Sequence, residues 1–171
     1  MSAVGNNVTQ TTRNKAIEAA RWLPHGADAE NSRTADKFVI RGYKVLFSEL
    51  DRLAVLQQRS KNSECIMAIL ESLRGRKQTT ATSNAMRAYM GEQLSAQVLA
   101  VVPKFVMPHG KPDAKFVIRF PNEVRDLLIQ ASTDEGFGSM IAWTRDALEY
   151  WILVQRQQQA LLAAIAVVDG E

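Results

Sequence analysis

The pentapeptide Lys-Phe-Val-Ile-Arg occurs twice in the chain, at residues 37–41 and again at residues 115–119. In both copies, alternation places Phe and Ile on one face and Lys, Val and Arg on the other, which is the pattern of a short strand with one buried side. A strand of this kind needs a partner, because a free edge leaves backbone N–H and C=O groups unpaired. The two copies therefore suggest a duplicated unit built around a strand.

The spacing of the two pentapeptides extends into the residues that follow them. A separation of 78 residues, from 37 to 115, aligns mostly apolar positions further along the chain without gaps. The aligned pairs are Leu46 with Val124, Leu50 with Leu128, Leu53 with Ala131, Leu70 with Leu148, Glu71 with Glu149 and Leu73 with Trp151. Pro-His-Gly also precedes each strand, at 24–26 and 108–110, although at a different separation. This pattern indicates an old duplication in which the apolar positions survive.

Each strand is followed by two stretches of helical periodicity. In the first copy, a helix is predicted from about Lys44, a break at 58–62 with Ser60 as the cap, and then a second helix. In the second copy, a helix is predicted from Asn122 to the stop at Gly136, and another starts near Gly138 or Ser139. Each unit thus consists of a strand and two helices, and is too small to bury a core alone.

The expected fold class is mainly α with short β, with two strand–helix–helix units that each need a partner strand, plus accessory helices. Helices are predicted at 13–23 and 83–102, whereas 76–82 and 103–114 resemble linkers. The expected segments are a disordered start at 1–12, an accessory helix and loop at 13–36, the first unit at 37–75, a linker with a helix at 76–114, the second unit at 115–156 and a C-terminal helical tail at 157–171.

Composition excludes several classes of protein. No apolar run reaches the length of a membrane span, and nothing near the start marks a secretory signal, so a cytoplasmic protein is expected. One cysteine and two histidines are too few for a zinc site, and no cofactor or metal is expected. Residues 37–76 carry eight Lys or Arg against four acids, whereas residues 115–156 carry five against six, so the positive charge is concentrated in the first unit.

Several conspicuous side chains are better explained by structure than by chemistry. Trp143 and Trp151 fall on one helical face and are expected in the core, and Cys65 is expected to pack as a small apolar side chain. The histidines lie in Pro-His-Gly turns. The apolar tail could serve for docking or oligomerisation, or could fold back on the core of its own chain.

The two units resemble the ribbon-helix-helix DNA-binding proteins of the Arc and MetJ type. Arg59-Ser-Lys-Asn-Ser-Glu64 opens the second helix of one copy, and Lys115-Phe-Val-Ile-Arg-Phe-Pro121 leads into the first helix of the other. Two copies in one chain are similar in layout to the TraY family of relaxosome proteins. The sequence departs from the pattern at Gly42, where the second copy has Phe120, and at Glu49, where it has Leu127.

The resemblance implies double-stranded DNA as the partner, and it implies that the two units pair through a two-stranded antiparallel β-ribbon, one strand from each unit, laid in the major groove. The outward residues of the strands would then read bases: Lys37, Val39, Arg41, Lys115, Val117 and Arg119. Residues near the start of each second helix would bind phosphate: Arg59, Ser60, Lys61, Gly138 and Ser139.

A sequence-specific repressor of a plasmid or phage operon, or a conjugation accessory protein, is therefore expected, with self-association through the helices or the tail as a further possibility. The alternative is a protein–protein adaptor that retains the fold without reading bases. An enzyme is not expected, because no paired-carboxylate, nucleophile–base or phosphate-loop constellation stands out. Whether the two units pair within one chain or between chains is left open by the sequence.

Overall fold

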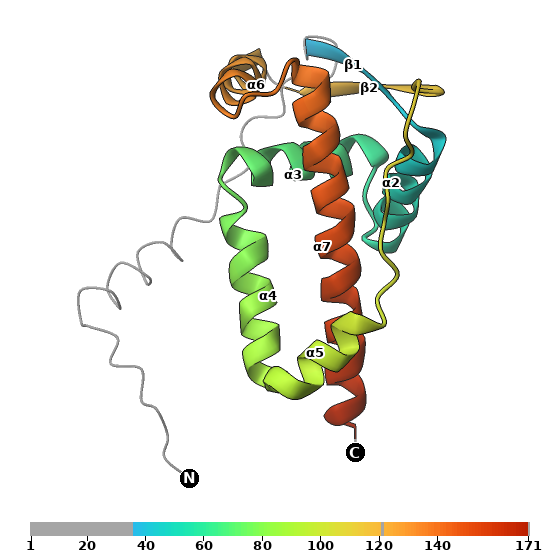
Figure 1. Cartoon of the computed structure of the whole chain (residues 1–171), viewed down its shortest axis with the longest axis vertical. Helices are drawn as coiled ribbons and strands as arrows, with labels where there is room; N and C mark the ends of the chain where they lie inside the picture. Colours follow the sequence, from blue (N-terminus) through green and yellow to red (C-terminus); the bar gives the residue numbers. More distant parts are fainter. Residues whose placement is uncertain (1–35, 121, 171) are drawn as a thin grey trace, which may run out of the picture. The chain divides into compact units, whose positions relative to one another are not determined.

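The computed structural model describes residues 36–120 and 122–170 (Figure 1). Two strands and six helices lie in this part of the chain, in the order β1, α2, α3, α4, α5, β2, α6 and α7. The predictions for residues 1–35, including the helix at 13–23 and the first Pro-His-Gly, lie outside the described residues, as does Pro121.

The two Lys-Phe-Val-Ile-Arg segments form the two strands of one antiparallel sheet within a single chain. Strand β1 spans Asp36–Gly42 and β2 spans Ala114–Phe120. Val39 lies opposite Val117, so the register is centred on the middle residue of both pentapeptides. Each Lys therefore faces the Arg of the other strand, Lys37 opposite Arg119 and Lys115 opposite Arg41. The ribbon consequently has the same chemistry when read from either strand.

Each strand leads into a pair of helices. Helices α2 (Lys44–Leu56) and α3 (Lys61–Leu73) follow β1, and α6 (Asn122–Asp134) and α7 (Met140–Val168) follow β2. The strands and first helices match at a separation of 78 residues, but the second helices begin 79 residues apart, at 61 and 140. The uniform separation used to align Leu70 with Leu148 is therefore wrong by one residue beyond the loop.

Burial supports the corrected alignment of α3 with α7. At a separation of 79 residues, Cys65 matches Thr144, Ala68 matches Ala147 and Ile69 matches Leu148, and all six are at most 1% exposed. The extra residue lies in the turn before α7, which runs from Glu135 to Ser139 and includes Gly136 with φ +73°. A one-residue insertion in a surface turn is tolerated because the buried faces of the helices are unchanged.

The inner face of the ribbon joins the hydrophobic core. Phe38, Ile40, Ile118 and Phe120 are each at most 7% exposed, and the rings of Phe38 and Phe120 lie 5.9 Å apart. Gly42 leaves room for a helix side chain: a Cβ at Gly42 would lie 3.1 Å from the Phe47 ring. Phe47 itself is 5.8 Å from Phe116 between ring centroids, so α2 supplies the aromatic group that β1 lacks at this end.

The segment between the units is more helical than its composition suggests. Residues 77–82 belong to α4 (Lys77–Met90) rather than to a linker, and α5 (Glu92–Ala100) follows Gly91. The buried Glu71 carboxylate accepts hydrogen bonds from the Thr79 backbone N–H at 2.7 Å and the Thr79 hydroxyl at 3.0 Å. Because a carboxylate satisfies a first-turn N–H group, α4 can start directly after α3.

Helix α7 is the central element of the fold. Figure 1 shows α4 beside its lower half and α5 crossing it obliquely, with α2 and α3 nearer the ribbon, and all four helices contact α7. The helix is continuous through the Gln-rich stretch to Val168. Leu161 is fully buried, whereas Leu162 and Val168 are both 52% exposed, so the tail packs with only one of its faces.

Candidate nucleic-acid interface

The outward face of the ribbon carries all six side chains that the sequence predicts to read bases. Lys37, Val39, Arg41, Lys115, Val117 and Arg119 are exposed, while the residues between them point inward. The two valines at the centre are 46% and 41% exposed, and two cations lie on either side of this pair. The structure therefore brings together, on one surface, residues that are 78 positions apart in the sequence.

One edge of the ribbon is held by a side chain to which the sequence reasoning assigned no role. The Asn62 amide oxygen accepts a hydrogen bond from the Arg119 N–H at 2.8 Å, and the Asn62 amide nitrogen donates to the Arg119 carbonyl at 3.1 Å. Asn62 thus pairs with the free edge of β2 as a further strand would. The sequence feature that could have pointed to Asn62 is its position two residues after the Ser60 cap, within the motif that opens α3.

The outer edge of β1 is contacted by a different kind of side chain. The Arg125 guanidinium of α6 donates to the Lys37 carbonyl at 3.3 Å. Two non-equivalent residues, Asn62 on α3 and Arg125 on α6, therefore hold the backbone polar groups of Arg119 and Lys37. The outward residues of the ribbon are therefore related by an approximate twofold axis, whereas the side chains that contact its two edges are different.

The start of α3 contains the first group of predicted phosphate-binding residues. The Ser60 hydroxyl caps the helix by accepting from the Ser63 N–H at 3.1 Å. Lys61 forms an ion pair with Asp51 and lies 5.1 Å from the centre of the Phe116 ring. Arg59 lies 3.6 Å from a Glu64 carboxylate oxygen. Both cations thus have acidic neighbours, which lowers the local positive charge.

The second predicted phosphate site is less well supplied. Ser139 caps α7 by accepting from the Ala142 N–H at 3.2 Å. Gly138 is exposed, and a Cβ built on it would have no atom within 4 Å, so the site does not require glycine for space. The two sites share a serine cap and differ in cationic side chains, since residues 138–140 are Gly, Ser and Met.

A buried polar link connects α3 to α7 beneath the first site. Glu64 is fully buried, and its carboxylate accepts a hydrogen bond from the Trp151 indole N–H at 2.7 Å. Trp143 and Trp151 are 2% and 5% exposed, as expected for core residues, but Trp151 also orients the carboxylate that faces Arg59. The link thus places a buried carboxylate oxygen 3.6 Å from Arg59, one of the residues predicted to bind phosphate.

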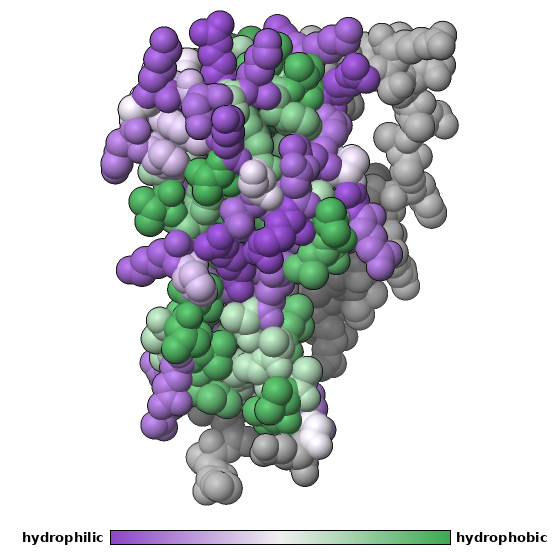
Figure 2. Space-filling model, turned by 90° about the vertical axis from the view of Figure 1, so that its right-hand side faces the viewer, coloured by the Kyte–Doolittle hydropathy of each residue, from purple (hydrophilic) through white to green (hydrophobic). Residues whose placement is uncertain are grey.

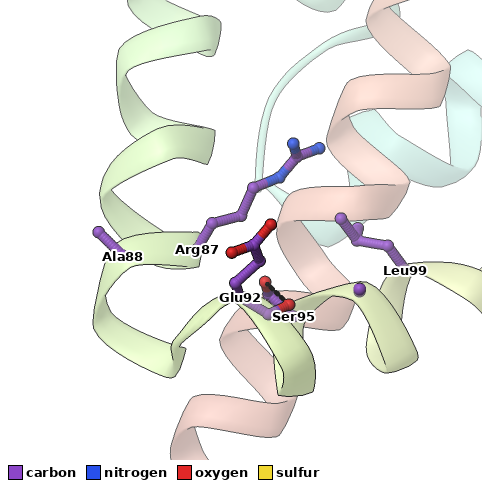
Figure 3. Close-up of a pocket in the computed structure, with 6 residues that line it drawn as sticks. Arg87, Ala88, Glu92, Ser95 and Leu99 are labelled. Atoms are coloured by element: carbon purple, nitrogen blue, oxygen red, sulfur yellow. Dashed lines mark hydrogen bonds between the residues drawn. The ribbon is translucent and has the colours of Figure 1, made fainter.

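Two cavities lie away from the ribbon, near α5. Figure 3 shows the one between α4 and α5, where the Arg87 side chain extends toward α7 and the Glu92 carboxylate rises toward it. This cavity has a volume of about 400 Å³. The charges of Arg87 and Glu92 cancel, so the cavity has no excess charge that would favour binding of an ion. A larger cleft of about 520 Å³ lies among α2, α5, the segment after α5 and α7.

The rest of the described chain gives two negative findings. Among residues 36–120 and 122–170, no three or more His, Cys, Asp and Glu side chains form a group that could hold a metal ion. In the same residues, no helix has both the length and the apolar character needed to cross a membrane.

Comparisons with known proteins add little to this geometry. No family model matches the chain, and no solved structure matches it. Tyrocidine synthase 3 of Brevibacillus parabrevis is 28% identical over 91 residues, which cover 53% of this chain and 1% of that protein. The chain thus spans a very small fraction of this curated protein, and the match does not show a family.

Proposed function

We propose that the chain is a tandem ribbon-helix-helix protein that binds duplex DNA sequence-specifically through its β-ribbon. The observation that supports this most directly is the exposed Lys-Val-Arg row on both strands, centred on Val39 and Val117. The major groove admits a two-stranded ribbon, so all six outward side chains could meet base edges at once.

The outward residues suit base reading. Arg and Lys donate to guanine O6 and N7, and Val can contact the thymine methyl, with each good bidentate pair contributing roughly 1–3 kcal/mol of discrimination. Because each strand presents the same three residues in opposite directions, an inverted repeat is the expected form of the DNA site. The capped starts of α3 and α7 would direct backbone N–H groups toward phosphates on either side.

The biological role that fits such a protein is repression of a plasmid or phage operon, or assembly at a transfer origin. The first unit carries the greater positive charge and the Arg59 and Lys61 side chains, so we expect it to contribute more phosphate contacts than the second. Affinity should therefore fall with salt concentration, as it does whenever cations displace condensed counterions.

A selection from random duplexes tests the proposal. The full-length protein should enrich a short inverted repeat, and the double substitution Arg41→Ala with Arg119→Ala should remove the enrichment while leaving the helical circular dichroism spectrum unchanged. The matched control is Arg74→Ala with Arg87→Ala, which removes two exposed arginines outside the ribbon. No enrichment at low salt, or equal effects of the two double substitutions, would contradict base reading by the ribbon.

An adaptor that retains the fold without reading bases is the second candidate. It is favoured by the pairing of Arg59 and Lys61 with acidic residues, which reduces the charge available to phosphates. An adaptor would show no DNA enrichment and would bind a protein through the exposed valines of the ribbon. Val39→Asp with Val117→Asp should then abolish protein binding without unfolding the chain.

A further inference from the structure

The cleft beside α5 combines an apolar wall with a cationic rim. The apolar wall consists of Val98, Val101 and Val102, and the rim contains Arg52 of α2 and Arg156 of α7. Its volume, about 520 Å³, falls in the range of roughly 300–1,000 Å³ that is usual for small-molecule sites. Figure 2 shows hydrophobic side chains gathered in the lower part of this side of the molecule, where α5 lies, below a band of hydrophilic ones.

The charged side chains at the rim form a connected group. Glu49 forms an ion pair with Arg156 at 2.7 Å and accepts a hydrogen bond from the Arg156 Nε at 3.2 Å. It also accepts from the Arg52 guanidinium at 3.3 Å. Arg156 also donates to the Pro103 carbonyl at 3.0 Å, which ties it to the segment after α5. Two arginines and one glutamate leave the group with a net charge of +1.

The two arginines have different freedom to bind a ligand. The Arg156 side chain is 18% exposed and is held by Glu49, Pro103 and the Phe105 ring, 5.5 Å away. The Arg52 side chain is 50% exposed, and its contacts with Glu49 are long. Arg52 can therefore turn a donor toward an anion in the cleft, while Arg156 stays in place as part of the rim.

The ionisation of Glu49 supports this count of charges. Burial would raise the pKa of Glu49, but the hydrogen bond and charge of Arg156, with Arg52, outweigh it and lower the pKa below its ordinary value. The carboxylate therefore remains charged near neutral pH and cannot itself donate to a ligand. The single excess positive charge of the group favours a monoanion over a dianion or a cation.

We propose that this cleft is a binding site for a small amphiphilic monoanion, with an aliphatic body against the valines and a carboxylate at Arg52. The apolar wall would bury the aliphatic body, and the guanidinium would form a charge-assisted hydrogen bond. The proposal goes beyond the function proposed for the ribbon and does not depend on DNA binding, because the cleft uses neither the outward face nor the helix caps.

Octanoate is a suitable probe, with 1-octanol as the neutral analogue of equal chain length. In a methyl NMR titration of the full chain, octanoate should shift the Val98, Val101 and Val102 methyl signals saturably, and roughly tenfold more tightly than octanol, as a charge-assisted hydrogen bond implies. Arg52→Gln should remove this preference. Arg74→Gln, at an exposed arginine outside the cleft, should leave it intact.

A second pair of variants tests the apolar wall at exposed positions where folding is not at risk. Val101 is 79% exposed at the cleft, and Val117 is 41% exposed on the ribbon, away from the cleft. Val101→Asp should weaken octanoate binding at least tenfold through like-charge repulsion, whereas Val117→Asp should not. The proposal is overturned if octanoate causes no saturable shift, if octanol binds as tightly, or if Arg52→Gln and Val101→Asp have no more effect than their controls.

Discussion

Single side chains at the ribbon edges decide how the outward residues are presented. Asn62 holds both backbone polar groups of Arg119, the residue that faces Lys37 across the ribbon. Arg125 contacts the carbonyl of Lys37 from the other side. The side chains proposed to read DNA therefore project from a backbone that is fixed by its neighbours, which reduces the entropy lost on binding.

Asn62→Ala should free the edge of β2 at Arg119. Because Arg119 is exposed, water can replace the lost partners, and the free energy of unfolding should fall by only about 1 kcal/mol. Amide hydrogen exchange at Arg119 should become faster, since its N–H loses the hydrogen bond to Asn62. Exchange measured by NMR checks this, with Asn84→Ala on α4 as the control. Unchanged exchange at Arg119 would contradict the role assigned to Asn62.

Cys65 should be chemically inert in the folded protein. Burial raises the pKa of the thiol to about 12, so very little thiolate is present at pH 8. Ellman's reagent should therefore react with Cys65 only after unfolding in urea. A reaction in native buffer at the rate of a free thiol would show that α3 opens readily.

At the scale of elements, the two units diverge where one of them acquires a different partner. Glu49 replaces an apolar position of the second unit, Leu127, and the structure shows why a charge is tolerated there. It binds Arg156, which lies in the part of α7 that extends beyond the length of α3. Leu127 is 49% exposed, so this position lies outside the buried core in the second unit, and the first unit uses it for an ion pair with Arg156.

Glu49→Gln should destabilise the protein at neutral pH and not in acid. The folded-state pKa of Glu49 is lowered, so its ionised form stabilises the fold above the unfolded-state pKa of about 4.5, and this stabilisation is lost as the pH falls through the folded-state value. Urea unfolding at pH 7 should show a loss of about 1 kcal/mol, since the ion pair is mostly buried.

The same comparison in acid provides the check on this assignment. At about pH 3 the difference between the native and Glu49→Gln proteins should shrink, because the native carboxylate is then increasingly protonated. Glu135→Gln, at an exposed glutamate in the turn before α7, serves as the control and should have little effect at either pH. A difference that stayed constant with pH would argue against an ionic role for Glu49.

For the whole molecule, the pairing of β1 with β2 within one chain has a direct consequence. The ribbon and its four associated helices share one core, so we expect the chain to fold without a second copy. The melting temperature should therefore be independent of protein concentration over a roughly hundredfold range, whereas an obligate dimer would melt at higher temperature when more concentrated. Differential scanning calorimetry measures this, and a rise with concentration would indicate exchange of strands between chains.

Local sequence patterns were sufficient to predict the two strands, the helices that follow them and the face that each strand buries. These features follow from the spacing of apolar and polar residues along the chain, and this spacing does not depend on tertiary contacts. The helical tail expected at 157–171 is the continuation of α7, which runs without a break from Met140 to Val168.

Three-dimensional contacts were needed to establish the register of the ribbon, the one-residue shift between α3 and α7, and the start of α4 at Lys77. Each depends on groups that are distant in sequence or on an unusual backbone conformation: Val39 opposite Val117, the turn at Gly136, and the Glu71 carboxylate that receives the Thr79 N–H. The same is true of Asn62 on the edge of β2 and of Glu49 beside Arg156. Local patterns indicate which face of a helix or strand is apolar. The partner against which that face packs is set by hydrogen bonds and charges between distant residues, and these cannot be inferred from the spacing of apolar residues.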